Sequence, residues 1–479
     1  MALAAAVAGC TSYQAKPLDP PAILAEVDRQ RRGDDAASTA ESAAEAAFTF
    51  AQAARWMAEH GPDLREARSQ YETALAVSRV PTPLPNPTIQ AGLQHAFGPD
   101  VGPIRRVQPF GGLGLTLPLG RTRACQNELN RVIAERLHVE LEARHREIYL
   151  DLRRSYAQWC VAAARIETGK KVGESFGKSV ALSRQLVEAG VATSLDVGLL
   201  ELEQGRAEAA VLSARHDLAG LERELSRLIG VHAERFVAPS EPLLPDLPDE
   251  PPAPGELIAV LLDHHPALAR LRAQYEEAEA TLRLEIARQW PDLQIGTPFS
   301  SDPDVRRTVI GLSLGLELPL LDRNQPGIAK AHHQREEVRL KYEAAANRAL
   351  ADIEGARQAA ARAADEWRFV RQTLLPRAEK NVDLAQRQLQ AGSGDTLGFL
   401  TAQRARAELV VEALEAELSL REAWVDLEQA IGKPLLHFPG ESDAGRPGAA
   451  QPEVAAPSAT PESPETSATP ERPVRRRLR

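Results

Sequence analysis

The stretch Pro87-Thr88-Ile89-Gln90-Ala91-Gly92 recurs as Pro291-Asp292-Leu293-Gln294-Ile295-Gly296, 204 residues further along the chain. Three further pairs follow in the same order at offsets of 201 or 202 residues: 114–119 with 315–320, Ala189-Gly190 with Ala391-Gly392, and Leu228-Ile229-Gly230 with Ala430-Ile431-Gly432. Four landmarks in one order with so little drift indicate a tandem duplication. The chain therefore folds as two similar halves.

Composition divides the remaining sequence. Residues 237–254 hold seven prolines in 18 residues, which predicts an extended connector, because proline fixes φ and removes a donor. Residues 440–479 are rich in Pro, Ala, Ser, Thr and Glu, which predicts a disordered tail. The expected organisation is a signal segment 1–10, an N-terminal region 11–62, a first repeat 63–236, the connector 237–254, a second repeat 255–439, and the tail 440–479.

Each half contains two short segments whose side chains alternate in character. In the first half, Ile89, Ala91 and Leu93 alternate with polar residues or glycine. In the second half, apolar residues around Leu314 alternate in the same way with polar residues or glycine. Period-2 alternation with a Gly-rich second face is typical of membrane β-barrel strands. We expect four strands, near 88–97, 107–117, 292–300 and 307–318. A half-exposed hairpin on a soluble helical domain is the alternative.

Long helices follow the strands in both halves. No proline occurs from 121 to 189, a length that permits ~100 Å of helix, and 328–391 contains only Pro376. Helices of this length must pack as coiled coils, and the Ala-rich run in the second half favours close approach. Gly190 and Gly392 are expected to end them.

Four strands cannot close a barrel, which needs at least about eight. Exposed strand edges are not tolerated in lipid, because their backbone groups have no water partner. If the hairpins cross a membrane, several copies must therefore share one barrel. Three copies would supply 12 strands.

Cys10 follows Val7-Ala8-Gly9 at the end of a short apolar segment. This resembles a bacterial lipobox, in which the cysteine becomes the lipid-modified (acylated) first residue of the mature protein. The alternative is a chance cysteine. Cys125 and Cys160 lie too far apart on one predicted helix to form a disulfide, and they are expected to pack.

The composition excludes several classes of function. A net charge of −10, from 57 basic and 67 acidic residues, argues against nucleic-acid binding. No apolar run is long enough for a transmembrane helix. Phosphate-binding and nucleophile-elbow motifs are absent, and the pairs His264-His265 and His332-His333 are expected at the solvated surface. We predict a protein without catalysis, cofactor or metal site.

Taken together, these motifs resemble the TolC-like outer-membrane efflux proteins. The likeness runs from about residue 63 to 436 and includes Pro85-Asn86-Pro87, 117–121 and both Ala-Gly turns. The run 319–325, Pro-Leu-Leu-Asp-Arg-Asn-Gln, is most similar to the metal-cation (Czc-type) branch. The resemblance implies a mainly α protein with a membrane β-barrel part. Duplicated hairpins would form a trimeric 12-stranded barrel, continued by a tunnel of long coiled-coil helices.

The resemblance also implies a constriction at the far ends of the helices, near the periplasmic turns. In the second repeat, the family's acidic positions match Gly398 and Thr401, whereas the first repeat has Asp196. A ring of Asp196 carboxylates could attract cations, although Asp196 could instead only cap its helix. The expected tip residues are Gly190, Leu195, Asp196, Gly392, Asp395, Leu397 and Gly398.

The function implied is a passive exit duct of a tripartite efflux or secretion system, conducting small solutes or metal cations. Its partners would be two further copies, a periplasmic adaptor, an inner-membrane pump and outer-membrane lipid. The competing hypothesis is a periplasmic coiled-coil scaffold or adaptor whose hairpins never enter lipid.

Overall fold

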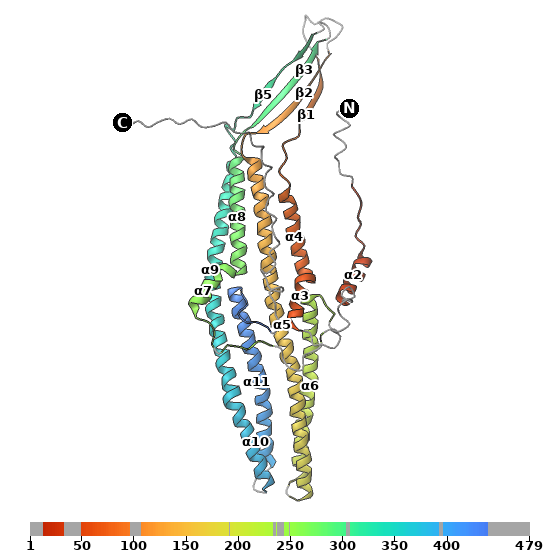
Figure 1. The fold of residues 1–479 in the computed structure, drawn as a ribbon, viewed down its shortest axis with the longest axis vertical. Helices are drawn as coiled ribbons and strands as arrows, with labels where there is room; N and C mark the ends of the chain where they lie inside the picture. Colours follow the sequence, from red (N-terminus) through yellow and green to blue (C-terminus); the bar gives the residue numbers. More distant parts are fainter. Residues whose placement is uncertain are drawn as a thin grey trace, which may run out of the picture.

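The computed structural model describes residues 13–32, 49–95, 107–190, 192–232, 236, 244–248, 250–302, 307–391 and 396–438. The chain forms an elongated body with a small sheet at one end and two helical hairpins reaching the other end (Figure 1). In the described part of the chain, no helix combines the length and apolar character needed to span a membrane.

The two halves of the chain correspond element by element. The first has α3 (Phe50–His60), α4 (Pro62–Arg79), β1 (Thr88–His95), β2 (Val107–Pro118), α5 (Thr122–Glu188) and α6 (Ser194–Ile229), after a separate helix α2 (Pro20–Arg32). The second has α7 (Pro254–His264), α8 (Pro266–Ala287), β3 (Asp292–Asp302), β4 (Arg307–Ile310), β5 (Ser313–Leu316), α9 (Gln325–Phe369), α10 (Leu375–Gln390) and α11 (Thr396–Ile431). Helices α4 and α8 both begin at a proline, 204 residues apart. The duplication is confirmed, and it extends to α3 and α7.

The sheet is antiparallel throughout, in the order β1-β2-β3, with β4 and β5 both paired to β3. The expected strands are present, but the fourth is divided into β4 and β5. The division lies opposite Pro298, which has no N–H for the ladder, although the Gly311 N–H still donates to the Pro298 carbonyl at 2.9 Å.

The two faces of the sheet differ, as the alternation predicted. One face carries the row Thr88, Gly114, Gly296 and Ser313, and the opposite face carries the row Leu115, Ile295 and Leu314. A Cβ at Gly114 would lie 2.6 Å from Thr88 Oγ1, and one at Gly296 would lie 2.6 Å from Ser313 Oγ. Glycine therefore permits the crowding on the polar face, and a groove of about 540 Å³ lies along that face.

The long helices differ between the halves. Helix α5 runs unbroken for 67 residues, as expected. Its counterpart is interrupted by a five-residue π-helical turn, Val370–Leu374, between α9 and α10. The expectation of one long helix here needs this correction. Pro376 explains it: its ring would clash with the carbonyl four residues earlier, and the wider π turn just before it gives room.

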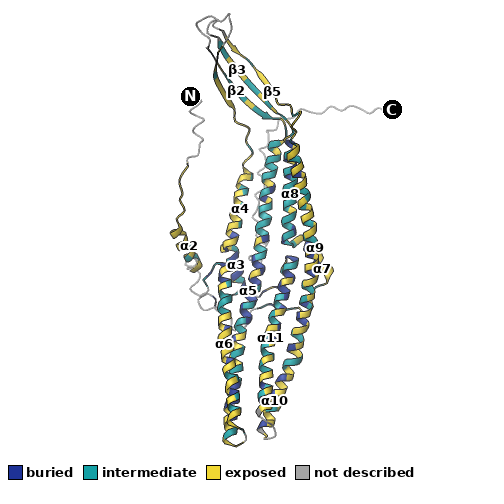
Figure 2. Ribbon diagram, turned by 180° about the vertical axis from the view of Figure 1, so that it is seen from behind, coloured by how far each residue is buried: buried dark blue, intermediate teal, exposed yellow. Residues whose placement is uncertain are grey.

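The core is concentrated at mid-length (Figure 2). In the first half it is aromatic, with Phe50, Tyr149, Tyr156 and Trp159 all at most 1% exposed. In the second half α9 contributes mostly alanine, including Ala349, Ala360 and Ala364, packed against leucines of α7 and α11.

A buried ion pair joins the halves. Arg153 of α5 donates from Nε and Nη2 to the two carboxylate oxygens of Glu428 of α11, at 2.8 and 2.9 Å. Glu428 also accepts the backbone N–H groups of Leu435 and Leu436, and Arg153 Nη2 donates to the Leu436 carbonyl at 2.8 Å. The segment that follows α11 is thereby fixed across the first repeat, where Phe438 stacks on Phe50 with ring centroids 3.9 Å apart.

The histidine pairs do not behave alike. His332 and His333 are exposed, as expected. His264 and His265 are half-buried, and His265 Nδ1 accepts the Leu268 N–H at the start of α8, so the surface prediction for this pair was wrong. His265 caps helix α8 because it lies just before Pro266, the first residue of that helix.

Candidate functional site

The expected tip residues that the structure describes lie at the end of the body opposite the sheet: Gly190, Leu195, Asp196, Leu397 and Gly398. In the first repeat, Gly190 follows α5 with φ of 77°, a left-handed conformation suited to glycine, and ends the helix as predicted. Leu195 in the first turn of α6 is 69% exposed. A large apolar side chain is therefore exposed at this tip, where it can contact a partner.

Asp196 belongs to a capping box. The Thr193 backbone N–H and its hydroxyl both donate to Asp196 Oδ2 at 2.8 Å, and the Asp196 N–H donates to Thr193 Oγ1 at 3.4 Å. The N-cap residue is thus Thr193, and Asp196 is its partner at the third helical position. A carboxylate held in this way also interacts favourably with the helix dipole.

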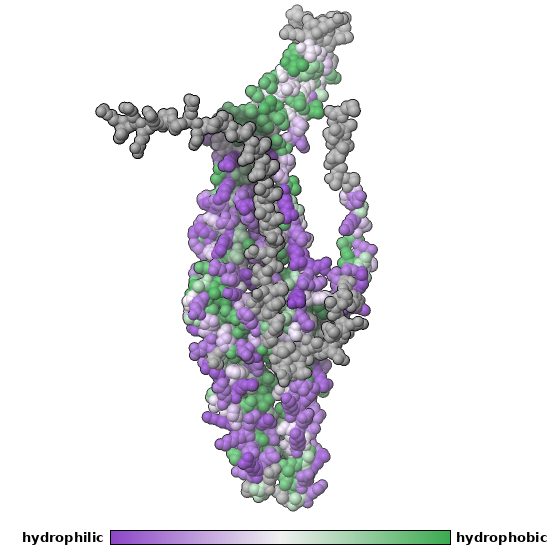
Figure 3. Space-filling view, in the orientation of Figure 1, coloured by the Kyte–Doolittle hydropathy of each residue, from purple (hydrophilic) through white to green (hydrophobic). Residues whose placement is uncertain are grey.

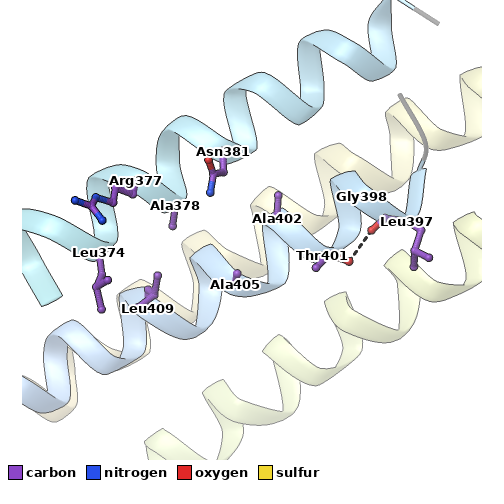
Figure 4. A pocket seen from close by; sticks show the side chains of 10 residues that line it. All are labelled: Leu374, Arg377, Ala378, Asn381, Leu397, Gly398, Thr401, Ala402, Ala405 and Leu409. Carbon is purple, nitrogen blue, oxygen red and sulfur yellow. Dashed lines mark hydrogen bonds between the residues drawn. The ribbon is translucent and has the colours of Figure 1, made fainter. Parts of the chain in front are cut away.

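In the second repeat, Gly392 and Asp395 lie outside the described residues. Leu397 and Gly398 are in the first turn of α11, where Leu397 is 60% exposed and its carbonyl accepts the Thr401 hydroxyl at 2.8 Å. Both residues line a groove of about 660 Å³ between α10 and α11 (Figure 4).

Sequence reasoning missed the other side of this groove. Arg377 and Asn381, one turn apart on α10, line it on the opposite wall, together with the small residues Ala378, Ala402 and Ala405 (Figure 4). The signal was available, since the i, i+4 spacing places both polar residues on one face directly after Pro376.

The two hairpins touch one another at the tip. Val382, Leu389 and Phe399 of the second hairpin form a small buried cluster, against which Leu186 of α5 packs. A second cluster joins Phe176, Val180 and Leu200 to Leu400 of α11. Any opening between the hairpins must therefore separate these apolar contacts.

Among the described strands, the sheet at the other end has two edges without a partner strand, β1 and β4–β5. The most exposed apolar side chains of the strands gather there: Ile89 is 76% and Leu93 is 73% exposed on one edge, and Ile310 is 75% and Leu314 is 69% exposed on the other. Figure 3 shows the hydrophobic colouring over this end, above a largely polar helical body. In a single copy, the backbone groups of the two edges have no partner strand in the described sheet, and the apolar side chains stay exposed.

Cys10 lies outside the described residues. Among those described, no group of three His, Cys, Asp or Glu side chains is arranged to hold a metal ion. Cys160 is buried, which raises the pKa of its thiol to about 12, and Cys125 is half-buried.

Comparison with known proteins adds to this geometry. Residues 257–433 match the family described as "Outer membrane efflux protein". The chain is 23% identical over 321 residues to the cobalt-zinc-cadmium resistance protein CzcC of Cupriavidus metallidurans, covering 67% of this chain and 76% of the relative.

Solved structures extend the likeness to both repeats. The outer-membrane channel OprN superposes with a TM-score of 0.65 at 18% identity, over 80% of this chain and 89% of that one. CusC, a protein whose structures describe transmembrane channel formation, gives 0.65 at 16% identity over 80% and 92%. The similarity to the outer-membrane efflux proteins that the motifs indicated is therefore confirmed, by family sequence over the second repeat and by fold over most of the chain.

Proposed function

We propose that this protein is the outer-membrane exit duct of a tripartite efflux system and acts without catalysis. The observation that carries the proposal is the amphipathic sheet with two open edges at one end of a helical body. Helix α5 alone spans ~100 Å, which suits passage from an outer-membrane pore deep into the periplasm.

The functional unit in this proposal is a homotrimer that shares one barrel of 12 strands. The edge strands support this arrangement: β1 and β4–β5 have the opposite chain directions needed for antiparallel pairing between neighbouring copies. The face with Gly114, Gly296 and Ser313 would line the lumen, and the face with Leu115, Ile295 and Leu314 would meet lipid.

The far tips would form the gate and the docking site for a periplasmic adaptor, which connects to an inner-membrane pump. Leu195 and Leu397 are exposed there, and the α10–α11 groove could accept a helical hairpin by coiled-coil packing. Asp196 would place one carboxylate per copy at the constriction. Opening would be a shear of packed helices that separates Leu186 from the cluster of the second hairpin.

The cargo class is a small solute or metal cation, as the similarity to CzcC suggests. A lipid anchor at Cys10 would add a second attachment to the outer membrane. Mass spectrometry of the mature N-terminus tests it, and an unmodified peptide across residues 5 to 15 would exclude acylation.

The central experiment is fractionation of the full-length protein, followed by single-channel recording in planar bilayers. The duct predicts recovery in the outer-membrane fraction and cation-permeable conductance. Recovery of the folded protein in the soluble fraction would favour the periplasmic scaffold instead.

A matched pair of strand variants tests the two faces. Leu314→Arg should disrupt insertion, because a charge on the lipid face near mid-bilayer costs ~2–4 kcal/mol. Ser313→Arg, at the adjacent position, should be tolerated in the lumen. Equal loss of membrane-inserted trimer in both variants would contradict the assigned faces.

A further inference from the structure

Helix α2 carries an apolar stripe that remains largely exposed among the described residues. Pro20, Ile23, Leu24 and Val27 recur with helical spacing, and none of the residues of α2 is buried. Leu24 is 69% exposed, and Ile23 and Val27 are about half as exposed as a free side chain, at 44% and 45%.

The helix is nevertheless fixed in place at its other end. Arg31 Nη2 donates to Ser226 Oγ at 3.2 Å, Arg65 donates to Gln30 Oε1 at 2.8 Å, and the His232 N–H donates to the Arg31 carbonyl at 2.9 Å. These bonds hold α2 beside α4 and α6. Val27 lines a pocket of about 330 Å³ against them, whereas Leu24 and Ile23 remain exposed. A helix anchored through polar contacts with its apolar side in water needs a partner for that side.

A second uncovered stripe lies on α7. Leu257 and Leu261 face the core of the second repeat, whereas Ile258 and Leu262, one turn apart on the neighbouring face, are 43% and 54% exposed. The helix is 11 residues long and α2 is 13, so the two stripes are similar in length.

The positions of α2 and α7 make them complementary. In Figures 1 and 2 the two helices project from opposite flanks of the body at similar height along its long axis. The open edge β1 lies on the flank of α2, and the open edge β5 lies on the flank of α7 (Figure 1). Pairing of these edges between copies therefore brings the α2 flank of one copy to the α7 flank of the next.

We propose that the apolar stripe of α2 packs on Ile258 and Leu262 of α7 in a second copy of this chain, as a clasp around the middle of the ring. The contact is heterologous, with two different surfaces meeting, and such contacts close into rings when the rotation permits. It rests on the proposed ring of copies but adds an interface that the strands and long helices do not require.

Cysteine pairs test the clasp in the intact membrane protein. In a background with Cys125→Ser and Cys160→Ala, the pair Leu24→Cys and Leu262→Cys is oxidised and separated on denaturing, non-reducing gels. We expect covalent dimers and trimers that disappear on reduction. Each single variant controls for other cysteines, including Cys10.

The matched control is Leu24→Cys with Leu212→Cys, because Leu212 on α6 is similarly exposed at 58% but belongs to the first repeat. This pair should give at least tenfold less covalent trimer. Equal yields from the two pairs, or cross-linking of Leu24→Cys only to a different protein, would overturn the clasp.

A second variant does not depend on oxidation. Leu24→Asp should leave the protomer folded, because the side chain is exposed there, and should lower the temperature at which the trimer dissociates in detergent. Arg29→Asp, on the polar side of α2, controls for the added charge. Native mass spectrometry of the unmodified protein separates the two proposals: absence of a trimer refutes the shared barrel, whereas a trimer without Leu24–Leu262 cross-links refutes only the clasp.

Discussion

The two repeats reach the same fold with different packing. The first has an unbroken α5 and an aromatic mid-length core, whereas the second has a π turn before Pro376 and a core of alanines and leucines. Their equivalent positions also differ in chemistry: Ser226 lies 202 residues before Glu428, and Phe236 lies 202 before Phe438. Duplication thus preserved the backbone path while the contacts that join the halves became asymmetric.

That asymmetry has a structural consequence. Phe236 stays in its own repeat, where its ring lies 6.1 Å from that of Trp159. Phe438 crosses to the first repeat and stacks on Phe50, beneath the guanidinium of Arg153. The aromatic core of the first repeat therefore contains a residue from each half. A change that breaks its connection to the second repeat should lower the free energy of unfolding more than the equivalent change within one repeat.

The largest effect is expected at Glu428. Glu428→Ala leaves the buried guanidinium of Arg153 without its carboxylate partner, so that its charge is no longer compensated, which should lower the free energy of unfolding by ~3–5 kcal/mol. The equivalent change Ser226→Ala removes one hydrogen bond with Arg31 and should cost only about 1 kcal/mol. Urea unfolding in detergent, followed by tryptophan fluorescence, measures both, and equal costs would show that the halves are joined elsewhere.

The long helices offer the next test. Glu174 occupies the position in α5 that corresponds to Pro376, 202 residues later. Glu174→Pro should cost ~3 kcal/mol, because α5 has no π turn to receive the ring. Thermal unfolding monitored by circular dichroism measures the cost. The converse change Pro376→Ala is the control and should be neutral or stabilising; a loss as large as that of Glu174→Pro would refute the role given to the π turn.

Acid should weaken the first repeat through His145. Burial, aided by the nearby charges of Arg146 and Arg68, lowers the pKa of His145 to about 4, from 6.5 in the unfolded chain. The unfolded state therefore binds the proton more readily, so this contribution to stability is complete above pH 6.5 and is lost as the pH falls toward 4. The expected loss is about 2–3 kcal/mol.

The measurement compares unfolding midpoints of the unmodified protein and His145→Gln at pH 7.5 and pH 4.5. The variant retains the titration of all the carboxylates, so the difference between the two proteins isolates the histidine. An equal pH dependence in both proteins would contradict the assignment.

The smallest effect, and the most informative about the proposed gate, is expected at Asp196. Asp196→Ala should cost about 1 kcal/mol by opening the capping box with Thr193. Asp196→Asn keeps a side-chain acceptor for the cap but removes the charge, so it should preserve stability and reduce cation selectivity in planar bilayers. Unchanged conductance and selectivity in both variants would show that Asp196 only caps its helix and has no role in the gate.

Much of the architecture was predictable from local sequence. Alternation located all four strand regions, because the side-chain period of a strand is visible wherever one face is apolar. The absence of proline from 121 to 189 predicted α5, and Gly190 predicted its end. The spacing of repeated motifs predicted the correspondence of the halves.

The candidate sites were harder to predict from the sequence. The groove between α10 and α11 depends on which helical faces meet, and the uncovered stripes of α2 and α7 are recognisable only when the rest of the core has been assigned. In the same way, nothing local connects Arg153 with Glu428, 275 residues away.

The sequence by itself determined the duplication, the two-faced strands and the long helices, since each depends on periodicity or on the backbone restrictions of proline and glycine. Only the tertiary structure decided the pairing of Arg153 with Glu428, the crossing of Phe438 into the first repeat and the opposite flanks of α2 and α7. These features arise from contacts between distant segments, whose geometry is set by how complete helices pack rather than by any local pattern.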